Sequence, residues 1–411
     1  YNTVDSSVLA SFVGQNSFAA LGVAETYVNL FVFILLGACT GISVVLATHF
    51  GAKQYELFRR AFFLALTAGG FLTLAFSLAG VFCTKWGLGL INTPPELLEE
   101  SATFLRIVCG GLICCYIYNL CAAALRAVGN TRIAAIILFG SLLVKSVFSY
   151  LLAVIFGLGI TGAGLSTVVT QIIACLAFYG YAKTFLPELI FTREDMIFDK
   201  AELRKIFNYS SMTALQQSSV QIGKVLIQGS INSLGAAHIA AYAAAARLES
   251  FVNTFSQSLA ASLALFVAQN IGAKNPVRTK EGFKRARFIS SMCGIVTVAI
   301  MYGFAPLGIS FFIDSVAGDN VALASGVAYL RTVAFFYLIC FWGAIYQGYL
   351  RGAGILDVQY YGTTGQIAAR VIFTWLFIKT MGLVAVAWAT GLGWVLITFY
   401  QLYYWHKHDL N

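Results

Sequence analysis

The stretch FLRIVCGGLICCYIYNLCAAALRAVG, residues 104–129, returns later in the chain as YLRTVAFFYLICFWGAIYQGYLRGAG, residues 329–354. The two copies align without a gap at a separation of 225 residues. Each is an apolar run long enough to cross a bilayer as a helix, with an arginine near each end. The repeat therefore predicts a duplicated membrane-spanning element. The arginines are Arg106 and Arg126 in the first copy, and Arg331 and Arg351 in the second.

The composition places most of the chain in lipid. Of 411 residues, 59% are hydrophobic and only 10% are charged, and the mean hydropathy is +0.80, far outside the range of soluble domains. Only helices or closed barrels satisfy their backbone hydrogen bonds in hydrocarbon. Because the alternating pattern of a barrel strand is missing, we expect an all-α polytopic membrane protein.

Twelve apolar runs predict twelve transmembrane helices. The first run is too short to span, so we expect its upstream half to lie outside this sequence. The predicted spans are 1–14, 17–48, 61–83, 101–125, 133–157, 161–183, 207–233, 237–270, 286–313, 325–350, 355–378 and 382–405.

The duplication extends beyond the opening pair. Gly-Ala-Lys at 51–53 returns at 272–274, a separation of 221 residues. Each half then holds six spans in the same order. Because six is even, both halves enter the membrane from the same side, and the two repeats are parallel, related by a pseudo-two-fold axis along the membrane normal. We predict an N-lobe at 1–183, a cytoplasmic linker at 184–206 and a C-lobe at 207–411, the plan of an alternating-access transporter.

The basic residues predict the orientation. Eighteen of the 26 Lys and Arg lie in alternate connections or the C-terminal tail, whereas the intervening connections hold only Lys85 and Lys379. The positive-inside rule places the first set, and both termini, in the cytoplasm, so we expect a multi-pass protein of the cell membrane. The net charge of +9 is then a topology signal, and a nucleic-acid partner is not required.

The sequence offers no metal, cofactor or catalytic signature. The nine cysteines lie inside or at the edges of spans, where thiols act as small apolar side chains. No H-E-x-x-H, C-x-x-C or Walker A motif occurs. We therefore expect no metal site, no cofactor and no catalytic residue, and not an enzyme.

Several of these elements resemble one transporter family. The run 233–274, its parallel at 17–53 and the L-R-x-x-G turns are similar to those of the multidrug and toxic compound extrusion (MATE) transporters. The resemblance implies a twelve-span exporter with two six-helix lobes, which expels amphipathic, often cationic compounds in exchange for H+ or Na+. It also implies a bilayer and small molecules as partners; we expect a monomer.

Three carboxylates lie within the predicted spans. Asp5 lies about ten residues, or ~15 Å, from the outer end of its span, near mid-membrane, and matches the Asp position of the family's first span. Glu249 lies about as deep in the eighth span, and Glu25 lies in the outer third of the second. A carboxylate in lipid is a candidate for coupling or substrate binding, with a structural ion pair as the alternative.

Lys145 and Ser149 depart from the family pattern. They lie one helical turn apart on one face, where many MATE proteins have N-x-x-x-D. A lysine offers only donors and brings a positive charge, so it does not help to coordinate Na+. We predict that Lys145 occupies the place of a bound cation and pairs with Asp5.

Five further residues complete the predicted coupling or substrate site. Their alternative roles are architectural, such as hydrogen bonding between helices or anchoring. They are Asn119, Gln217, Lys224, Arg247 and Arg370.

The predicted function is therefore that of an ion-coupled multidrug antiporter. The alternative is a flippase for a lipid-linked anionic precursor, or an exporter of organic anions, on the same fold. This alternative follows from six basic residues against three acidic ones within the spans.

Overall fold

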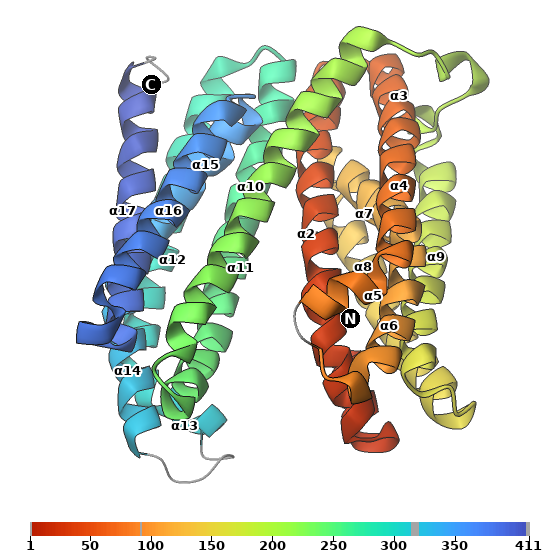
Figure 1. Ribbon diagram of the computed structural model, residues 1–411. Coiled ribbons are helices and arrows are strands. Elements are labelled where there is room, and N and C mark those ends of the chain that lie inside the picture. The colour runs from red at the N-terminus through yellow and green to blue at the C-terminus, as the bar shows by residue number, and fades with distance from the viewer. Residues whose placement is uncertain (1, 91–92, 314–319, 408–411) are drawn as a thin grey trace. The chain divides into compact units, whose positions relative to one another are not determined.

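The computed structural model describes residues 2–90, 93–313 and 320–407 (Figure 1). The chain forms two compact units, Tyr1–Ala214 and Leu215–Asn411. The helix α10 is continuous across this boundary, so the linker predicted at 184–206 leads into a helix that belongs to both units.

The first unit is built from helices throughout its described residues, with three π-helical turns and two short 3-10 turns. Its elements are α1 (Asn2–Val8), η1 (Leu9–Val13), α2 (Gln15–Gly51), α3 (Tyr55–Leu64), η2 (Ala65–Gly69), α4 (Gly70–Phe82), α5 (Thr84–Leu90), α6 (Pro95–Gly110), α7 (Leu112–Ala127), α8 (Thr131–Tyr150), η3 (Leu151–Ile155), α9 (Gly159–Phe185), η4 (Pro187–Leu189), η5 (Arg193–Asp195) and the start of α10 (Lys200–Asn232).

The second unit is likewise helical where it is described. After the end of α10, its elements are α11 (Ala236–Gly272), α12 (Pro276–Gly303), α13 (Ala305–Ile313), α14 (Asn320–Ala334), α15 (Tyr337–Gly352), α16 (Leu356–Met381) and α17 (Leu383–Lys407).

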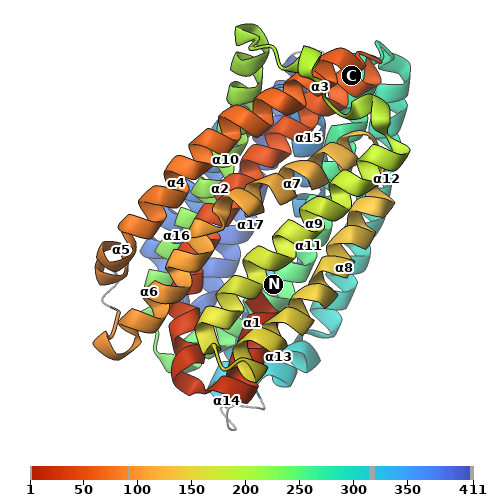
Figure 2. The ribbon, with the colours of Figure 1, turned by 90° about the vertical axis from the view of Figure 1, so that its right-hand side faces the viewer.

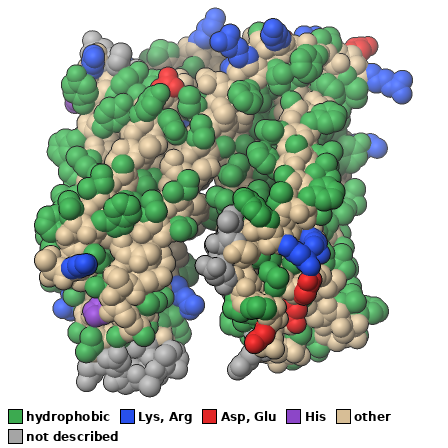
Figure 3. Space-filling model, in the orientation of Figure 1, with side chains coloured by type: hydrophobic (Ala, Val, Ile, Leu, Met, Phe, Trp, Pro, Cys, Tyr) green, Lys and Arg blue, Asp and Glu red, His purple; other side chains and the backbone are tan. Residues whose placement is uncertain are grey.

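The helices agree with the expected polytopic membrane fold. Each of the twelve predicted spans corresponds to one helix or to consecutive helical segments, except that residue 1, like residues 408–411 of the predicted C-lobe, lies outside the described part of the chain. Among described residues, seven helices are long and apolar enough to cross a membrane, or up to nine if each bent pair counts as one span. Hydrophobic side chains cover much of the face in Figure 3, and Phe71, for example, is 75% exposed.

The helices α10 and α16 fall short of that apolar threshold because polar side chains interrupt them. The amide of Gln216 on α10 donates to the hydroxyl of Thr363 on α16 over 3.0 Å, and both side chains are buried. Hydrogen bonds of this kind hold helices together where there is no water to compete.

The two units repeat one packing scheme. In the first, α2 packs against α6 and α7, and α9 packs against α6, α7 and α8. In the second, α11 packs against α14 and α15, and α17 packs against α14, α15 and α16. Figure 2 faces the first unit and shows α8 and α9 side by side. The contacts thus follow the duplication read from the sequence.

The turns repeat even the backbone conformation. Lys53 and Lys274 are the two non-glycine residues with positive φ, at 58° and 54°, among the described residues. Gly129 and Gly354 of the opening stretch have φ of 86° and 80°. Left-handed backbone at the same place in both copies indicates that each G-A-K and L-R-x-x-G motif encodes a specific turn.

The opening stretch contains a bend in each copy. The axes of α6 and α7 differ by 47°, and those of Val321–Ala334 and α15 by 51°. The first bend has Gly110 and Gly111, whereas the second has Phe335 and Phe336 at the equivalent positions. A Cβ atom added at Gly391 of α17 would lie 2.2 Å from the Phe336 ring. At the second bend, Phe336 therefore packs closely over a glycine of α17.

We expect Gly391→Ala to lower the melting temperature of the detergent-purified protein. The added methyl group overpacks the Phe336 contact, which typically costs about 1–3 kcal/mol. Adding Phe336→Ala should restore part of the loss, because it removes the clashing ring. Gly365→Ala on α16 is the matched control, since nothing lies within 4 Å of its added Cβ. Equal melting temperatures for Gly391→Ala and Gly365→Ala would contradict this packing.

The linker docks on the first unit through Asp195. The Asp195 Oδ2 atom accepts hydrogen bonds from Arg59 Nε at 2.7 Å, Thr192 N at 2.8 Å and Thr192 Oγ1 at 2.9 Å. Arg59 also donates to the carbonyl of Glu188 over 2.9 Å. Burial alone would raise the pKa of the Asp195 carboxyl, but the hydrogen bonds from Arg59 and Thr192 hold this pKa below its usual value.

Linker docking should consequently depend on pH. A lowered carboxyl pKa contributes stability above the unfolded pKa of about 3.9, and that stability is lost as pH falls through the lower folded value. We expect amide hydrogen exchange in 187–199, corrected for intrinsic rate, to be slow at neutral pH and to rise in that acidic window. Asp195→Asn should exchange rapidly at all pH values, whereas exposed Glu194→Gln should behave as wild type; similar protection in both variants would exclude this role for Asp195.

Candidate functional site

An ion pair buried in the first unit joins two of the predicted site residues. Lys145 Nζ on α8 lies 2.6 Å from Asp5 Oδ1 on α1. Asp5 is 2% exposed, and Lys145 is fully buried. Ser149 lies one turn after Lys145 and donates to the same Asp5 oxygen over 2.9 Å. The pairing of Lys145 with Asp5 is present as expected, and Ser149 contacts the carboxylate directly.

Helix α9 supplies the remaining partners of the lysine. Lys145 Nζ donates to the carbonyl of Ala163 at 2.9 Å, to Ser166 Oγ at 2.7 Å and to Thr167 Oγ1 at 2.6 Å. With Asp5, four oxygen atoms surround the ammonium group. An ion pair away from water is tolerated when such extra hydrogen bonds satisfy it, and removal of one partner typically costs about 3–5 kcal/mol.

A close approach between helices brings these oxygens to the lysine. Helix α8 ends in the π-turn η3, and α9 begins at Gly159 after a turn of three residues, 156–158. A Cβ atom added at Gly162 would lie 2.5 Å from the backbone carbon of Leu152 in η3. The glycine therefore lets the first turns of α9 lie against η3, which places Ala163 and its neighbours beside the Lys145 ammonium.

Glu25 on α2 is near this pair but does not join it. It is half-buried, its Oε1 atom is buried without a hydrogen-bond partner, and it lies close enough to Asp5 for electrostatic interaction. Two carboxylates thus share this part of the first unit with one lysine.

A second polar cluster lies in the second unit. Glu249 on α11 is 6% exposed and accepts a hydrogen bond of 2.8 Å from the hydroxyl of Tyr329 on α14. The rings of Tyr329 and Tyr242 pack edge to face with centroids 5.6 Å apart. The guanidinium of Arg370 on α16 hydrogen-bonds Tyr242 and interacts electrostatically with Glu249.

Lys224 on α10 adds a second positive charge to this cluster. It interacts with both Arg370 and Glu249, and the Nε atom of Arg370 is buried without a hydrogen-bond partner. Two bases therefore face one carboxylate in the second unit. In the first, the Lys145 charge is matched by Asp5, with Glu25 nearby.

Lys145 and Arg370 occupy equivalent places in the duplication. They are separated by 225 residues, as are the two copies of the opening stretch. Each lies on the helix before the final span of its repeat: α8 precedes α9, and α16 precedes α17. The duplicated fold thus retains one base at this position in each unit, while the acidic partners differ: Asp5 is on α1 and Glu249 is on α11.

Three predicted site residues do not join these clusters. The Asn119 amide donates within its own helix, to the carbonyl of Cys115 at 2.8 Å. Arg247 is exposed, with its guanidinium 5.5 Å from the centroid of the Phe312 ring, and does not pair with Glu249. Gln217 is half-buried on α10.

The structure adds four polar residues that the sequence analysis did not propose. They are Ser166, Thr167, Tyr242 and Tyr329. A sequence signal existed for Ser166 and Thr167, because they end the run GLGITGAGLST at 157–167, which parallels TMGLVAVAWAT at 380–390 in the second half. Tyr242 and Tyr329 are tyrosines of apolar helices, and only the structure places them beside Glu249.

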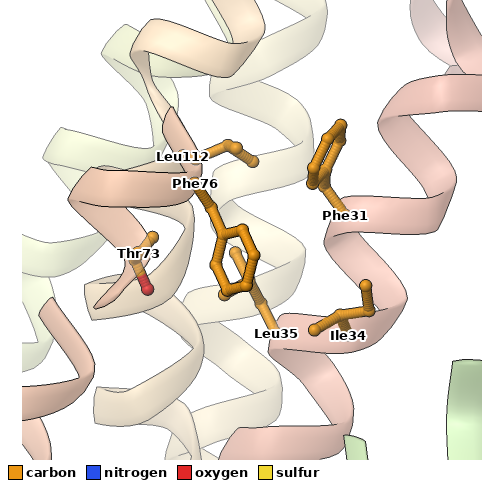
Figure 4. Close-up of a pocket in the computed structure, with 6 residues that line it drawn as sticks. All are labelled: Phe31, Ile34, Leu35, Thr73, Phe76 and Leu112. Atoms are coloured by element: carbon orange, nitrogen blue, oxygen red, sulfur yellow. The ribbon is translucent and has the colours of Figure 1, made fainter. Parts of the chain in front are cut away.

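A crevice between α2, α4 and α7 is too small to be a ligand site. Figure 4 shows that Phe31, Ile34 and Leu35 point from α2 toward Phe76 on α4, with Thr73 and Leu112 beside them. The space is about 10 Å³, less than one water needs, and its lining is apolar. Among the described residues, no group of three or more His, Cys, Asp or Glu side chains is placed to hold a metal ion.

Comparisons with known proteins agree with this architecture. The MatE family model matches residues 1–151 and 213–376. The chain is 24% identical over 399 residues to the "Probable multidrug resistance protein YpnP" of Bacillus subtilis (strain 168), which covers 96% of this chain and 88% of that protein.

Solved structures share the fold. One, reported as "Reverse polarity of binding pocket suggests different function of a MOP superfamily transporter from Pyrococcus furiosus Vc1 (DSM3638)", has a TM-score of 0.90 at 18% identity and covers 100% of this chain and 91% of that one. Another, an "Outward-facing conformation of a multidrug resistance MATE family transporter", has a TM-score of 0.90 at 19% identity and covers 100% and 91%. With the family model matching well over half of its residues, this membrane protein belongs to the MatE family of transporters.

Proposed function

We propose that this chain is a secondary antiporter of the cell membrane, with both termini in the cytoplasm. It exports small amphipathic, often cationic compounds in exchange for H+ or Na+ by alternating access between its two lobes. The observation that carries the proposal is the Asp5 carboxylate, buried in α1 and paired with Lys145 in a duplicated transporter fold. The YpnP protein of Bacillus subtilis, described as a probable multidrug resistance protein, supports the substrate class.

Competition for Asp5 provides the coupling step. Lys145 Nζ and the Asp5 carboxylate form an ion pair at 2.6 Å. A proton that binds Asp5 removes the negative charge and so breaks the ion pair, while Lys145 keeps its three neutral acceptors on α9. A substrate cation competes for the same carboxylate. One site therefore holds either a proton or a cationic ligand, as an exchange of the two requires.

Proton coupling is favoured over sodium coupling in the first unit. Sodium binds through oxygen atoms, and the oxygens of Asp5, Ala163, Ser166 and Thr167 already surround the Lys145 ammonium at 2.6–2.9 Å. The lysine offers only donors and repels a second cation. In the second unit, Glu249 with its Tyr329 hydrogen bond is the corresponding proton-exchanging group.

The second candidate function is export of organic anions or flipping of a lipid-linked anionic precursor. The favouring observation is the excess of positive charge in the second unit, where Lys224 and Arg370 interact with each other as well as with Glu249. Arg370 also has a free donor, Nε, for a carboxylate or phosphate oxygen. A fold alone does not choose between these substrate charges.

We expect proteoliposomes with an imposed pH gradient to export a cationic dye, and Asp5→Asn to abolish this transport. The amide cannot exchange a proton, although the variant should fold because Lys145 keeps its acceptors on α9. The dye, a carboxylate drug and a lipid-linked phosphate are compared under pH and sodium gradients. Exposed Glu56→Gln is the control.

Each outcome of this assay decides between the candidates. Dye efflux that persists when both gradients are collapsed would rule out antiport. Gradient-dependent transport of the carboxylate drug or the lipid-linked phosphate, but not of the dye, would establish the anion alternative. Unchanged transport by folded Asp5→Asn would refute the role of Asp5.

Replacement of the lysine should convert the coupling ion. We expect Lys145→Asn combined with Ser149→Asp to gain sodium-dependent transport, because the ammonium is replaced by oxygen ligands and a second carboxylate. Lys145→Asn alone should lose activity without gaining sodium dependence, since Asp5 is then a single carboxylate without the positive charge of Lys145 beside it. The measurement is dye efflux against sodium concentration at fixed pH. Ser146→Ala is the control, because the Ser146 hydroxyl donates to the Leu142 carbonyl of its own helix. Sodium-dependent transport by the wild-type protein would contradict the prediction that the Lys145 ammonium takes the place of a bound cation.

A further inference from the structure

A cavity of about 430 Å³ lies in the first unit, away from both polar clusters. It is bounded by α3, α7 and α9, which are labelled in Figure 2, and by the segment that follows α9. Its volume lies within the range of small-molecule sites. None of its lining side chains carries a formal charge, and their polar atoms are limited to the Tyr179 hydroxyl and the thiols of Cys121 and Cys175.

The start of the linker closes one end of this cavity. Leu186, Leu189, Ile190 and Phe191 line it. The Phe191 ring packs on α3, with its centroid 5.6 Å from that of Phe63 and at 6.2 Å from that of Phe62. The Arg59–Asp195 hydrogen bond fixes the same segment to α3, so the docked linker forms this end of the cavity.

The cavity opens toward lipid rather than toward the protein interior. Leu176 and Tyr179, which line it from α9, are 65% and 56% exposed. On a membrane-spanning helix, such apolar side chains contact hydrocarbon. The occupant that fits a charge-free, lipid-accessible cavity is an acyl chain, since its burial satisfies the apolar lining without leaving a polar group unpaired.

Positive charge lies at the end where the linker docks. Lys183 is exposed, follows the lining residue Ala182 and lies one turn after Tyr179. Basic side chains at the membrane surface attract anionic headgroups.

We propose that this cavity binds one acyl chain of an anionic phospholipid, whose headgroup contacts Lys183, and that this lipid stabilises the docked linker. This lipid belongs to the cytoplasmic leaflet of the membrane; that assignment rests on the orientation given under the proposed function. The lipid site itself does not depend on which compound is exported. It makes the linker between the lobes sensitive to the lipid around it.

The test measures lipid retention by the full-length protein in detergent, using native mass spectrometry with phosphatidylglycerol or phosphatidylcholine of the same chains. Wild type should retain phosphatidylglycerol preferentially. Ala124→Trp, which fills the cavity, should weaken this binding about tenfold, because exclusion of about two methylene groups has that effect. Lys183→Gln should remove the headgroup preference and leave chain binding. The matched control, Ala135→Trp, places the same ring on the exposed surface of α8.

Two results would overturn the proposal: equal lipid retention by Ala124→Trp and Ala135→Trp, or no headgroup preference in wild type. Displacement of the lipid by a transported dye at transport concentrations would identify the cavity as a substrate site instead. Failure of the lipid proposal can be distinguished from failure of the proposed function. A protein that exports no dye can still bind the lipid, and a protein that exports the dye can fail to bind the lipid.

A second measurement keeps the test decisive if Ala124→Trp fails to fold. Wild-type protein is labelled with a lipid-soluble N-alkylmaleimide, and modification of each cysteine is followed by peptide mass spectrometry. Phosphatidylglycerol should slow labelling of Cys121 and Cys175, which line the cavity. Cys293, a half-buried thiol of the second unit, is the control. Protection of all three cysteines alike, or of none, would contradict the proposal.

Discussion

Every backbone N–H and C=O group of this chain that lies in hydrocarbon must find its partner within the protein. Helices meet this requirement within one segment, which is why the described chain is built from them. The same constraint makes ionised side chains costly. Four oxygens surround the Lys145 ammonium within the spans. Glu25 and Arg370, in contrast, each keep one buried polar atom without a hydrogen-bond partner.

Duplication explains most of the architecture but little of the chemistry. The two units share helix order, packing partners, left-handed turn residues and a bend within the repeated stretch. Even so, the bends are made differently, with Gly111 in one copy and Phe336 against Gly391 in the other. The charges have diverged in the same way. A base is kept at Lys145 and Arg370, whereas the acidic partners come from different helices, so the two halves present different fields to a ligand.

The linker contributes both to the cavity of the first unit and to the helix that enters the second. Its docking through Asp195 and Phe191 closes an apolar cavity on the first unit, and it continues into α10, which contributes Lys224 to the polar cluster of the second. A lipid that holds the linker in place would therefore act on the one segment that is covalently common to both units. That arrangement gives the surrounding bilayer a route to influence transport without touching either carboxylate.

The sequence by itself determined the membrane solvent, the helical spans, the duplication and the candidate status of Asp5, Lys145 and Glu249, because hydropathy and repeated turn motifs are local properties. It also indicated the Asp5–Lys145 pair, since a donor-only side chain at a position resembling an ion site needs a carboxylate. Only the tertiary structure decided that Ser166 and Thr167 complete the lysine's partners, that Tyr329 binds Glu249, and that Asn119 serves its own helix. Those outcomes depend on which helix faces approach each other. At Gly162, α9 lies close against η3, and the hydrophobic period of one helix does not show which other helix it will contact.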